Sequence, residues 1–261
     1  MVGTPFHAVV SSRAAWRAPA RPPRRRAPAA RAWAASSGRA RPGPRRAGRR
    51  ERAPGVASRP RLWQDARAAE PVTPTVTLIR HPAAEAPAVR GVTASVARRA
   101  GDLTVEFALA GDLDALAIPP AGPPAPGARL WEHTCFEVFV AAGGAGYHEL
   151  NLAPSGAWQA HAFARYREGG PLADPGLAPR IDVARDARRL TLRAELALGR
   201  LAGVYRAAPL RLALAAVVED RTGARSWWAL RHPPGRPDFH HPDGFALGLD
   251  AAAPVEGPPA P

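Results

Sequence analysis

The sequence predicts an all-β protein, an antiparallel β-sandwich of about nine to eleven strands. Apolar and polar residues alternate with a period of two over several short segments, a pattern typical of strands with one face in a core. Turn-forming Gly, Pro, Asp and Ser residues separate these segments at roughly 8–12-residue intervals. The sequence shows no alternation of strands with helices and no Gly-rich phosphate loop after a strand, so a parallel α/β fold is not expected.

The alternation is clearest in residues 103–109, 190–198 and 210–218. In the first of these segments, every second residue from Leu103 to Leu109 is apolar. Weaker patterns predict the other strands, which in chain order are 76–80, 92–99, 131–140, 147–153, 158–166, 180–183, 226–230 and 245–249. Residues 199–205 are expected to add one helical turn.

Charge divides the chain into two regions. Residues 1–70 carry 17 Arg against three acidic residues, whereas residues 71–261 carry 19 Arg and 19 acidic residues. The N-terminal region is rich in Arg, Ala, Pro and Gly, and its stretch from Ala18 to Ala53 contains one aromatic residue and no Leu, Ile or Val. Such a stretch cannot bury enough apolar surface to offset the entropy of ordering, so residues 1–73 are predicted to be a disordered basic tail. Residues 74–250 are predicted to form one β-sandwich domain, followed by a disordered tail over 251–261.

Three explanations of the N-terminal tail are open. It is a solvated segment that binds RNA or acidic partners weakly, a transit-like segment, or an upstream stretch translated because the start codon was assigned too early. We favour the last, because the domain pattern begins only near Pro74. The folded region has no net charge, so no nucleic-acid partner is expected beyond weak electrostatic binding by the tail.

Composition also excludes several kinds of site. The single cysteine, Cys135, excludes an intrachain disulfide and a multi-Cys zinc or iron–sulfur site. No run of about 18 apolar residues predicts a membrane-spanning helix, and the N-terminus lacks the apolar core of a secretory signal. We therefore expect a soluble, cytoplasmic protein without a membrane partner.

The most informative block is residues 130–166, LWEHTCFEVFVAAGGAGYHELNLAPSGAWQAHAFARY, which predicts three strands joined by two tight turns. Phe136 and Val138 on the first strand, and Leu150 and Leu152 on the second, are expected to face the core. The opposite face would then gather aromatic and polar side chains into one site. The predicted ligand-binding residues are Trp131, His133, Glu137, Glu149, Asn151 and Trp158.

Side chains of these types suit a sugar, because aromatic rings stack on its CH faces while carboxylates and amides hold its hydroxyls. They also suit an ordinary interior, since strand aromatics often belong to a core and Glu–His pairs often form satisfied networks. Glu137 and Glu149 could also act as paired carboxylates in glycoside hydrolysis. Cys135 has no identifiable activating partner and is expected to be a small buried residue.

Residues 226–243, SWWALRHPPGRPDFHHPD, form a second dense patch with three His and two Asp residues. The spacing does not match a metal site, since the adjacent His240 and His241 would point apart in an extended chain. The nearby prolines favour an ordered loop whose Asp and His side chains satisfy backbone donors. No metal site is therefore predicted.

The run from Trp131 to Trp158, with its Pro154-Ser155-Gly156 turn, and the closing segment PDFHHPD at 237–243 resemble the bacterial DOMON-like family. The resemblance covers residues 74–249. It implies an immunoglobulin-like β-sandwich related to cytochrome-type DOMON domains and to family 9 carbohydrate-binding modules. Those relatives bind haem or sugars in a pocket on the sandwich.

The resemblance leaves two ligand classes open. Haem-binding DOMON domains typically hold the iron with a Met and a His, but the only methionine here is Met1, so haem binding would need His-only ligation. The candidate His ligands are His133, His148, His161, His232, His240 and His241. We predict a non-catalytic module that binds a carbohydrate or similar polar small molecule without a cofactor, with a haem-binding redox module as the alternative.

Overall fold

The computed structural model describes residues 75–99 and 101–251. Its strands are β1 (Val76–Arg80), β2 (Val89–Arg99), β3 (Asp102–Gly111), β4 (Ala125–Pro126), β5 (Cys135–Ala141), β6 (Tyr147–Leu152), β7 (Ala157–Arg165), β8 (Glu168–Leu172), β9 (Arg180–Arg185), β10 (Arg189–Leu196), β11 (Leu210–Glu219), β12 (Arg225–Ala229) and β13 (Leu247–Leu249). The predicted helical turn at 199–205 is confirmed by α1 (Leu198–Leu201) and a 3-10 turn over Gly203–Arg206.

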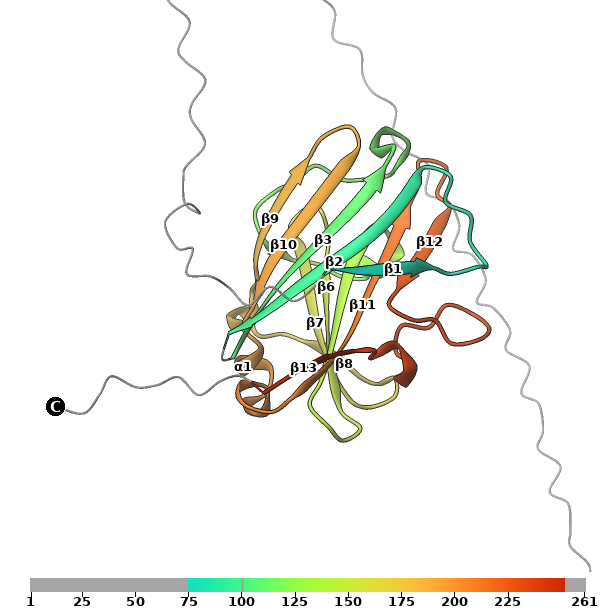
Figure 1. Ribbon diagram of the computed structural model, residues 1–261. Helices are drawn as coiled ribbons and strands as arrows, with labels where there is room; N and C mark the ends of the chain where they lie inside the picture. The colour runs from blue at the N-terminus through green and yellow to red at the C-terminus, as the bar shows by residue number, and fades with distance from the viewer. Residues whose placement is uncertain (1–74, 100, 252–261) are drawn as a thin grey trace, which may run out of the picture. The chain divides into compact units, whose positions relative to one another are not determined.

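The strands join into one sheet that curls over on itself (Figure 1). Strands β2, β3, β9 and β10 form the half nearer the viewer, which we call the front half. Strands β5, β6, β7 and β11 form the core of the back half. Strand β1 pairs with β2 along one edge and with β12 along the other, so hydrogen bonding is continuous between the two halves.

The all-β prediction is confirmed, but the predicted pair of separate antiparallel sheets is not observed. Strand β1 makes the sheet continuous, and β4 runs parallel to β7, which makes the sheet mixed. Every predicted strand segment contains a strand. The strands that the pattern missed are β4 and β8, which are short, contain Gly or Pro, and pair with β7 through their backbones. Neither has the alternation on which the prediction depended.

The main hydrophobic core lies between the two halves. Phe107 on β3 and Phe136 on β5 stack there with ring centroids 5.0 Å apart. Leu103 and Leu109 from the front half are fully buried in the same cluster. Fully burying a side chain of this kind contributes about 1.5–3 kcal/mol, so this contact between the halves supplies most of the hydrophobic stabilisation.

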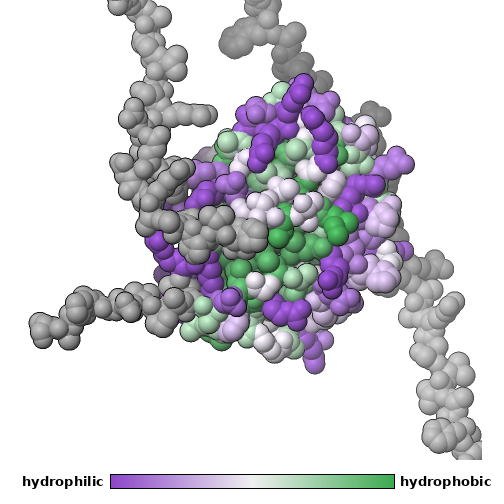
Figure 2. Space-filling view, viewed as in Figure 1, coloured by the Kyte–Doolittle hydropathy of each residue, from purple (hydrophilic) through white to green (hydrophobic). Residues whose placement is uncertain are grey.

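The outer face of the front half is the surface seen in Figure 2, where hydrophilic residues gather mainly around the rim and apolar residues lie nearer the middle. On β3, the buried Leu103 and Val105 alternate with the partly exposed Thr104 and Glu106, so one side of the strand faces the core and the other faces outward. No helix among the described residues is long and apolar enough to cross a bilayer. The predicted tails lie outside the described residues, except for Ala251.

Candidate functional site

The outer face of the back half is lined by polar side chains from alternate positions of its strands. In one row across the sheet, Glu137 on β5 lies between Ala215 on β11 and Asn151 on β6. In the next row, Glu149 on β6 lies between Phe139 on β5 and His161 on β7. Ala215 itself is buried in an apolar cluster with Phe139.

A loop from the second dense patch of the sequence covers this face. The Asp238 carboxylate accepts a hydrogen bond from the Arg167 guanidinium at 2.7 Å. The Tyr147 hydroxyl and His240 Nδ1 are hydrogen-bonded at 2.9 Å. Phe245 packs with Tyr147 and Phe139 in a small second apolar cluster. These contacts attach the loop between β12 and β13 to the ends of β6 and β7.

The loop and the sheet enclose a pocket of about 370 Å³, which falls in the size range of small-molecule sites. Four aromatic side chains line it: Trp131, Phe163, Trp227 and Phe239. The titratable residues that line it are Glu137, Glu149, His161, Arg167 and His240. We call this cavity the binding pocket.

Glycine allows two strands to pack closely at one wall of the binding pocket. Gly169 on β8 lies opposite Phe163 on β7 and lines the pocket. A side chain at Gly169 would collide with the carbonyl oxygen of Ala162. Strand β8 can therefore lie this close to β7 only with glycine at this position.

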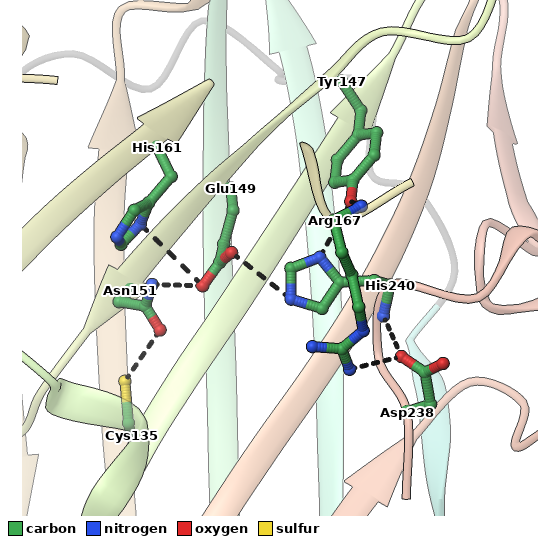
Figure 3. A network of polar contacts seen from close by, with 8 residues as sticks. All are labelled: Cys135, Tyr147, Glu149, Asn151, His161, Arg167, Asp238 and His240. Carbon is green, nitrogen blue, oxygen red and sulfur yellow. Dashed lines mark hydrogen bonds and ion pairs between the residues drawn. The ribbon is translucent and has the colours of Figure 1, made fainter. Parts of the chain in front are cut away.

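Glu149 is the centre of the polar network in the binding pocket (Figure 3). Its side chain accepts a hydrogen bond from Asn151 Nδ2, and its two oxygens lie 4.0 Å from His161 Nδ1 and 3.8 Å from His240 Nε2. The residue is only 5% exposed. Burial raises the pKa of Glu149, while the hydrogen bond from Asn151 and the charge of Arg167 act in the opposite direction.

Glu137 is buried even more completely, at 3% exposure, and its Oε1 has no hydrogen-bond partner within the described part of the chain. Burial raises its pKa well above the ordinary value, and the nearby Glu149 carboxylate raises it further. The charge of Arg167 lowers the pKa. The fold thus places a carboxyl group against the pocket without satisfying it.

The histidines of the pocket are neutral near pH 7. Burial lowers the pKa of His161. Burial, followed by the charge of Arg167, lowers the pKa of His240 to about 4. A neutral imidazole offers one donor and one acceptor, so both rings can hydrogen-bond a guest without adding charge.

The structure brings together Trp131, Glu137 and Glu149 of the predicted site as lining residues. Asn151 is fully buried beneath them, where it donates to Glu149 and contacts Cys135 Sγ through its Oδ1 at 3.7 Å. It therefore positions a lining residue without lining the pocket itself.

His133 does not join this group, because the strand predicted over 131–140 begins only at Cys135. Residues Leu130–Glu132 form a 3-10 turn, and this turn breaks the alternation that placed His133 beside Glu137. The His133 imidazole is 71% exposed and lies 2.7 Å from Glu219 in a different surface hollow. The same turn carries Trp131 to the mouth of the binding pocket, where it is 39% exposed and its ring lies edge-on to His161.

Trp158 is also placed elsewhere. It pairs with Leu152 across β6 and β7, and its side chain belongs to the main core, at 5% exposure. The pocket face of β7 carries His161 and Phe163 instead. Alternation along β7 puts His161 and Phe163 on the side opposite Trp158, and the pairing of Trp158 with the core residue Leu152 puts Trp158 on the core side.

Several residues that line the pocket were not predicted, and some of them lie on strands while others lie on turns and loops. His161 and Phe163 could have been found from register, since Glu149 on β6 pairs with His161 on β7. Trp227 could have been found from its neighbour, because Trp228 is buried in the core and adjacent strand residues face opposite sides. Arg167, Phe239 and His240 lie on turns and loops, for which periodicity gives no signal.

The pocket does not fit a haem held by two histidines. His161 and His240 are the only two of the six candidate histidines that line it, and the Glu149 carboxyl group lies between their rings (Figure 3). An iron bound to both imidazoles would need the space that this carboxyl group occupies. Across residues 75–99 and 101–251, no group of three His, Cys, Asp or Glu residues is arranged to hold a metal ion.

No protein-family model and no curated protein matches this sequence. Among solved structures, a protein from Bacteroides uniformis, described only provisionally as carbohydrate-binding, is similar at 13% identity with a TM-score of 0.49, over 65% of this chain and 83% of that chain. A family 9 carbohydrate-binding module from Caldicellulosiruptor kristjanssonii is similar at 10% identity. Its complex with glucose gives a TM-score of 0.34 over 56% of this chain and 69% of that chain. Its complex with cellotriose gives 0.35 over 59% and 75%.

At these identities and TM-scores, the likenesses assign no function to this chain, and its resemblance to the DOMON-like family stays a prediction. The function has to be argued from the residues of the binding pocket.

Proposed function

We propose that the protein is a non-catalytic binding module whose ligand is a carbohydrate or a similar polar small molecule. The observation that carries this proposal is the binding pocket, in which Trp131 and Trp227 lie together with the buried carboxyl groups of Glu137 and Glu149. Flat apolar surfaces beside a few fixed polar groups are what a sugar ring requires.

The state of Glu137 supports a guest that offers hydrogen bonds. Leaving a buried polar group unsatisfied costs about 1–3 kcal/mol, and Glu137 Oε1 has no partner among the residues described. A ligand hydroxyl that reaches this carboxyl group would offset part of that cost. Glu149 is already oriented by Asn151, so it can accept from a second hydroxyl without reorganising.

The same proposal extends to family and fold. The core lies between two facing halves of the curled sheet, as it does in a β-sandwich. This arrangement supports treating the fold as a variant of the immunoglobulin-like sandwich implied by the DOMON-like resemblance.

Calorimetric titration of the full chain with a panel of neutral mono- and oligosaccharides tests the function. We expect at least one sugar to bind and to be recovered unchanged. Trp131→Ala and Trp227→Ala should each weaken this binding by about tenfold or more. His133→Ala, which lies outside the pocket, should leave it unchanged. Absence of binding by every sugar, or equal effects of all three variants, would overturn the proposal.

A further inference from the structure

The charges of the pocket point to a narrower class of ligand. We infer that the binding pocket selects a guest bearing a protonated amine, such as an amino sugar, whose ammonium group lies against Glu137 and the pocket's aromatic rings. This inference rests on the proposed function and names the chemical class of its ligand.

The binding pocket has more acidic groups than its own cation could balance if both of them ionised. Glu137 and Glu149 supply two carboxyl groups. Arg167 is the only lining residue with a permanent positive charge, and its guanidinium is held by the Asp238 carboxylate at 2.7 Å. Burial lowers the pKa of His161 and, with the charge of Arg167, lowers that of His240 to about 4, so these two histidines, which also face the carboxyl groups, are mainly neutral near pH 7.

Two buried carboxylates that face one cavity cannot both ionise at low cost without a cation. Burial and the charge of Glu149 raise the pKa of Glu137, while Arg167 lowers it only from a distance, since the two make no ion pair. A guest ammonium group within hydrogen-bond reach of Glu137 would favour its ionised form and form a charge-assisted hydrogen bond. A neutral hydroxyl can hydrogen-bond the same group but cannot balance its charge.

The aromatic lining favours a cation for an independent reason. Trp131, Phe163, Trp227 and Phe239 present rings to the same cavity as the two carboxyl groups. The face of an aromatic ring attracts a cation, most strongly for Trp and in a desolvated site. Rings combined with carboxylates are therefore a better match for an ammonium group than for an anion.

Calorimetric titration of the full chain with three probes of one carbon skeleton tests the inference: glucosamine, glucose and N-acetylglucosamine. The titration is run at about pH 6.5, below the ~7.7 pKa of an ordinary α-amino group. We expect glucosamine to bind about tenfold more tightly than either neutral sugar. Equal affinities for the three probes would overturn the amine inference and leave the proposed function standing. Failure of glucosamine to bind would also overturn the amine inference, whereas the proposed function falls only if every sugar of the neutral panel fails to bind as well.

A variant assigns the preference to the carboxyl group. Glu137→Gln keeps the shape of the side chain and removes its charge, so it should weaken glucosamine binding about tenfold while changing glucose binding less than about threefold. Glu195→Gln on β10, far from the pocket in the sheet order, is the matched control and should keep the preference. An undiminished preference in folded Glu137→Gln would overturn the role of Glu137. If that variant does not fold, the wild-type comparison of the three probes still decides the inference.

Discussion

The two faces of the back half are almost equally buried and yet differ in chemistry. On β5, Phe136 points to the front half and Glu137 points the other way, and both are nearly inaccessible to water. On β6, Leu150 and Glu149 divide in the same manner. The inner face is covered by a second layer of strands, whereas the outer face is covered by a Pro-containing loop that leaves a pocket. What covers a buried residue, and not the extent of its burial, separates core from site here.

The difference has an energetic consequence. Apolar side chains on the inner face stabilise the fold as water is removed from them. Carboxyl groups on the outer face are desolvated with incomplete compensation, so they reduce stability. Residues that reduce stability are expected at functional sites, where activity requires groups that the fold alone would not favour.

The largest expected effect is a difference in stability between two tryptophan variants, one in the core and one at the pocket mouth. Trp158→Ala opens a cavity in the core and should lower the free energy of unfolding by about 3–5 kcal/mol. Trp131→Ala removes a partly exposed ring at the pocket mouth and should lower it by less than about 1 kcal/mol. Urea denaturation followed by far-UV circular dichroism measures both. Similar losses in the two variants would mean that the inner and outer faces do not differ as described.

A smaller effect is expected beneath the pocket. Asn151→Ala removes the hydrogen bond to the buried Glu149 carboxyl group, so it should cost about 1–3 kcal/mol of stability. It should also raise the pKa of Glu149 further, because that hydrogen bond lowers the pKa in the wild type. Urea denaturation measures the stability, and a carboxyl-carbon NMR titration measures the pKa.

A matched control for Asn151 lies in the same row of the sheet. Gln159 pairs with Asn151 across β6 and β7, and its Oε1 has no hydrogen-bond partner among the residues described. Gln159→Ala should therefore cost less than about 0.5 kcal/mol. A Glu149 pKa that stays unchanged in Asn151→Ala would show that the amide does not support this carboxyl group.

Alternation in the sequence predicted the strands and the two faces of the back half, because side chains of a strand must alternate between its sides. It could not predict which residues reach the pocket from outside the strands. Trp131 reaches it because Leu130–Glu132 form a turn, and Arg167 because it occupies a left-handed turn conformation with a φ of 57°. Such positions depend on local backbone geometry and on packing between distant segments, which a period of two does not encode.

Trp158 shows a different limit. Its type suggested a sugar platform, but the register with Leu152 puts it in the core. A tryptophan is an equally suitable residue in a core and in a binding pocket, so its type alone does not distinguish the two. Only its pairing with a neighbour whose direction is known shows which side of the sheet it faces. The continuous sheet was missed for a similar reason, because β1 joins both halves through backbone hydrogen bonds that leave no mark on residue type.

The last expected effect depends on pH. The pKa of Glu137 is raised well above the ordinary 4.5 in the native protein, so between those two values the native state binds more protons than the unfolded chain. Its contribution to stability is therefore complete below about pH 4.5 and is lost as pH rises toward the native pKa.

His161 and His240 act in the opposite sense, since their native pKa values lie below 6.5 and their contributions to stability grow as pH rises toward that value. The wild-type profile mixes these trends, but the difference between Glu137→Gln and wild type reports the Glu137 carboxyl group together with its effect on the neighbouring Glu149. We expect urea denaturation to show the variant gaining stability relative to wild type from about pH 4.5 to 8, by ~1.36 kcal/mol for each unit of pKa displacement covered. A difference that stays constant over this range would mean that Glu137 ionises as easily in the folded protein as in water, and that the outer face carries no unbalanced charge.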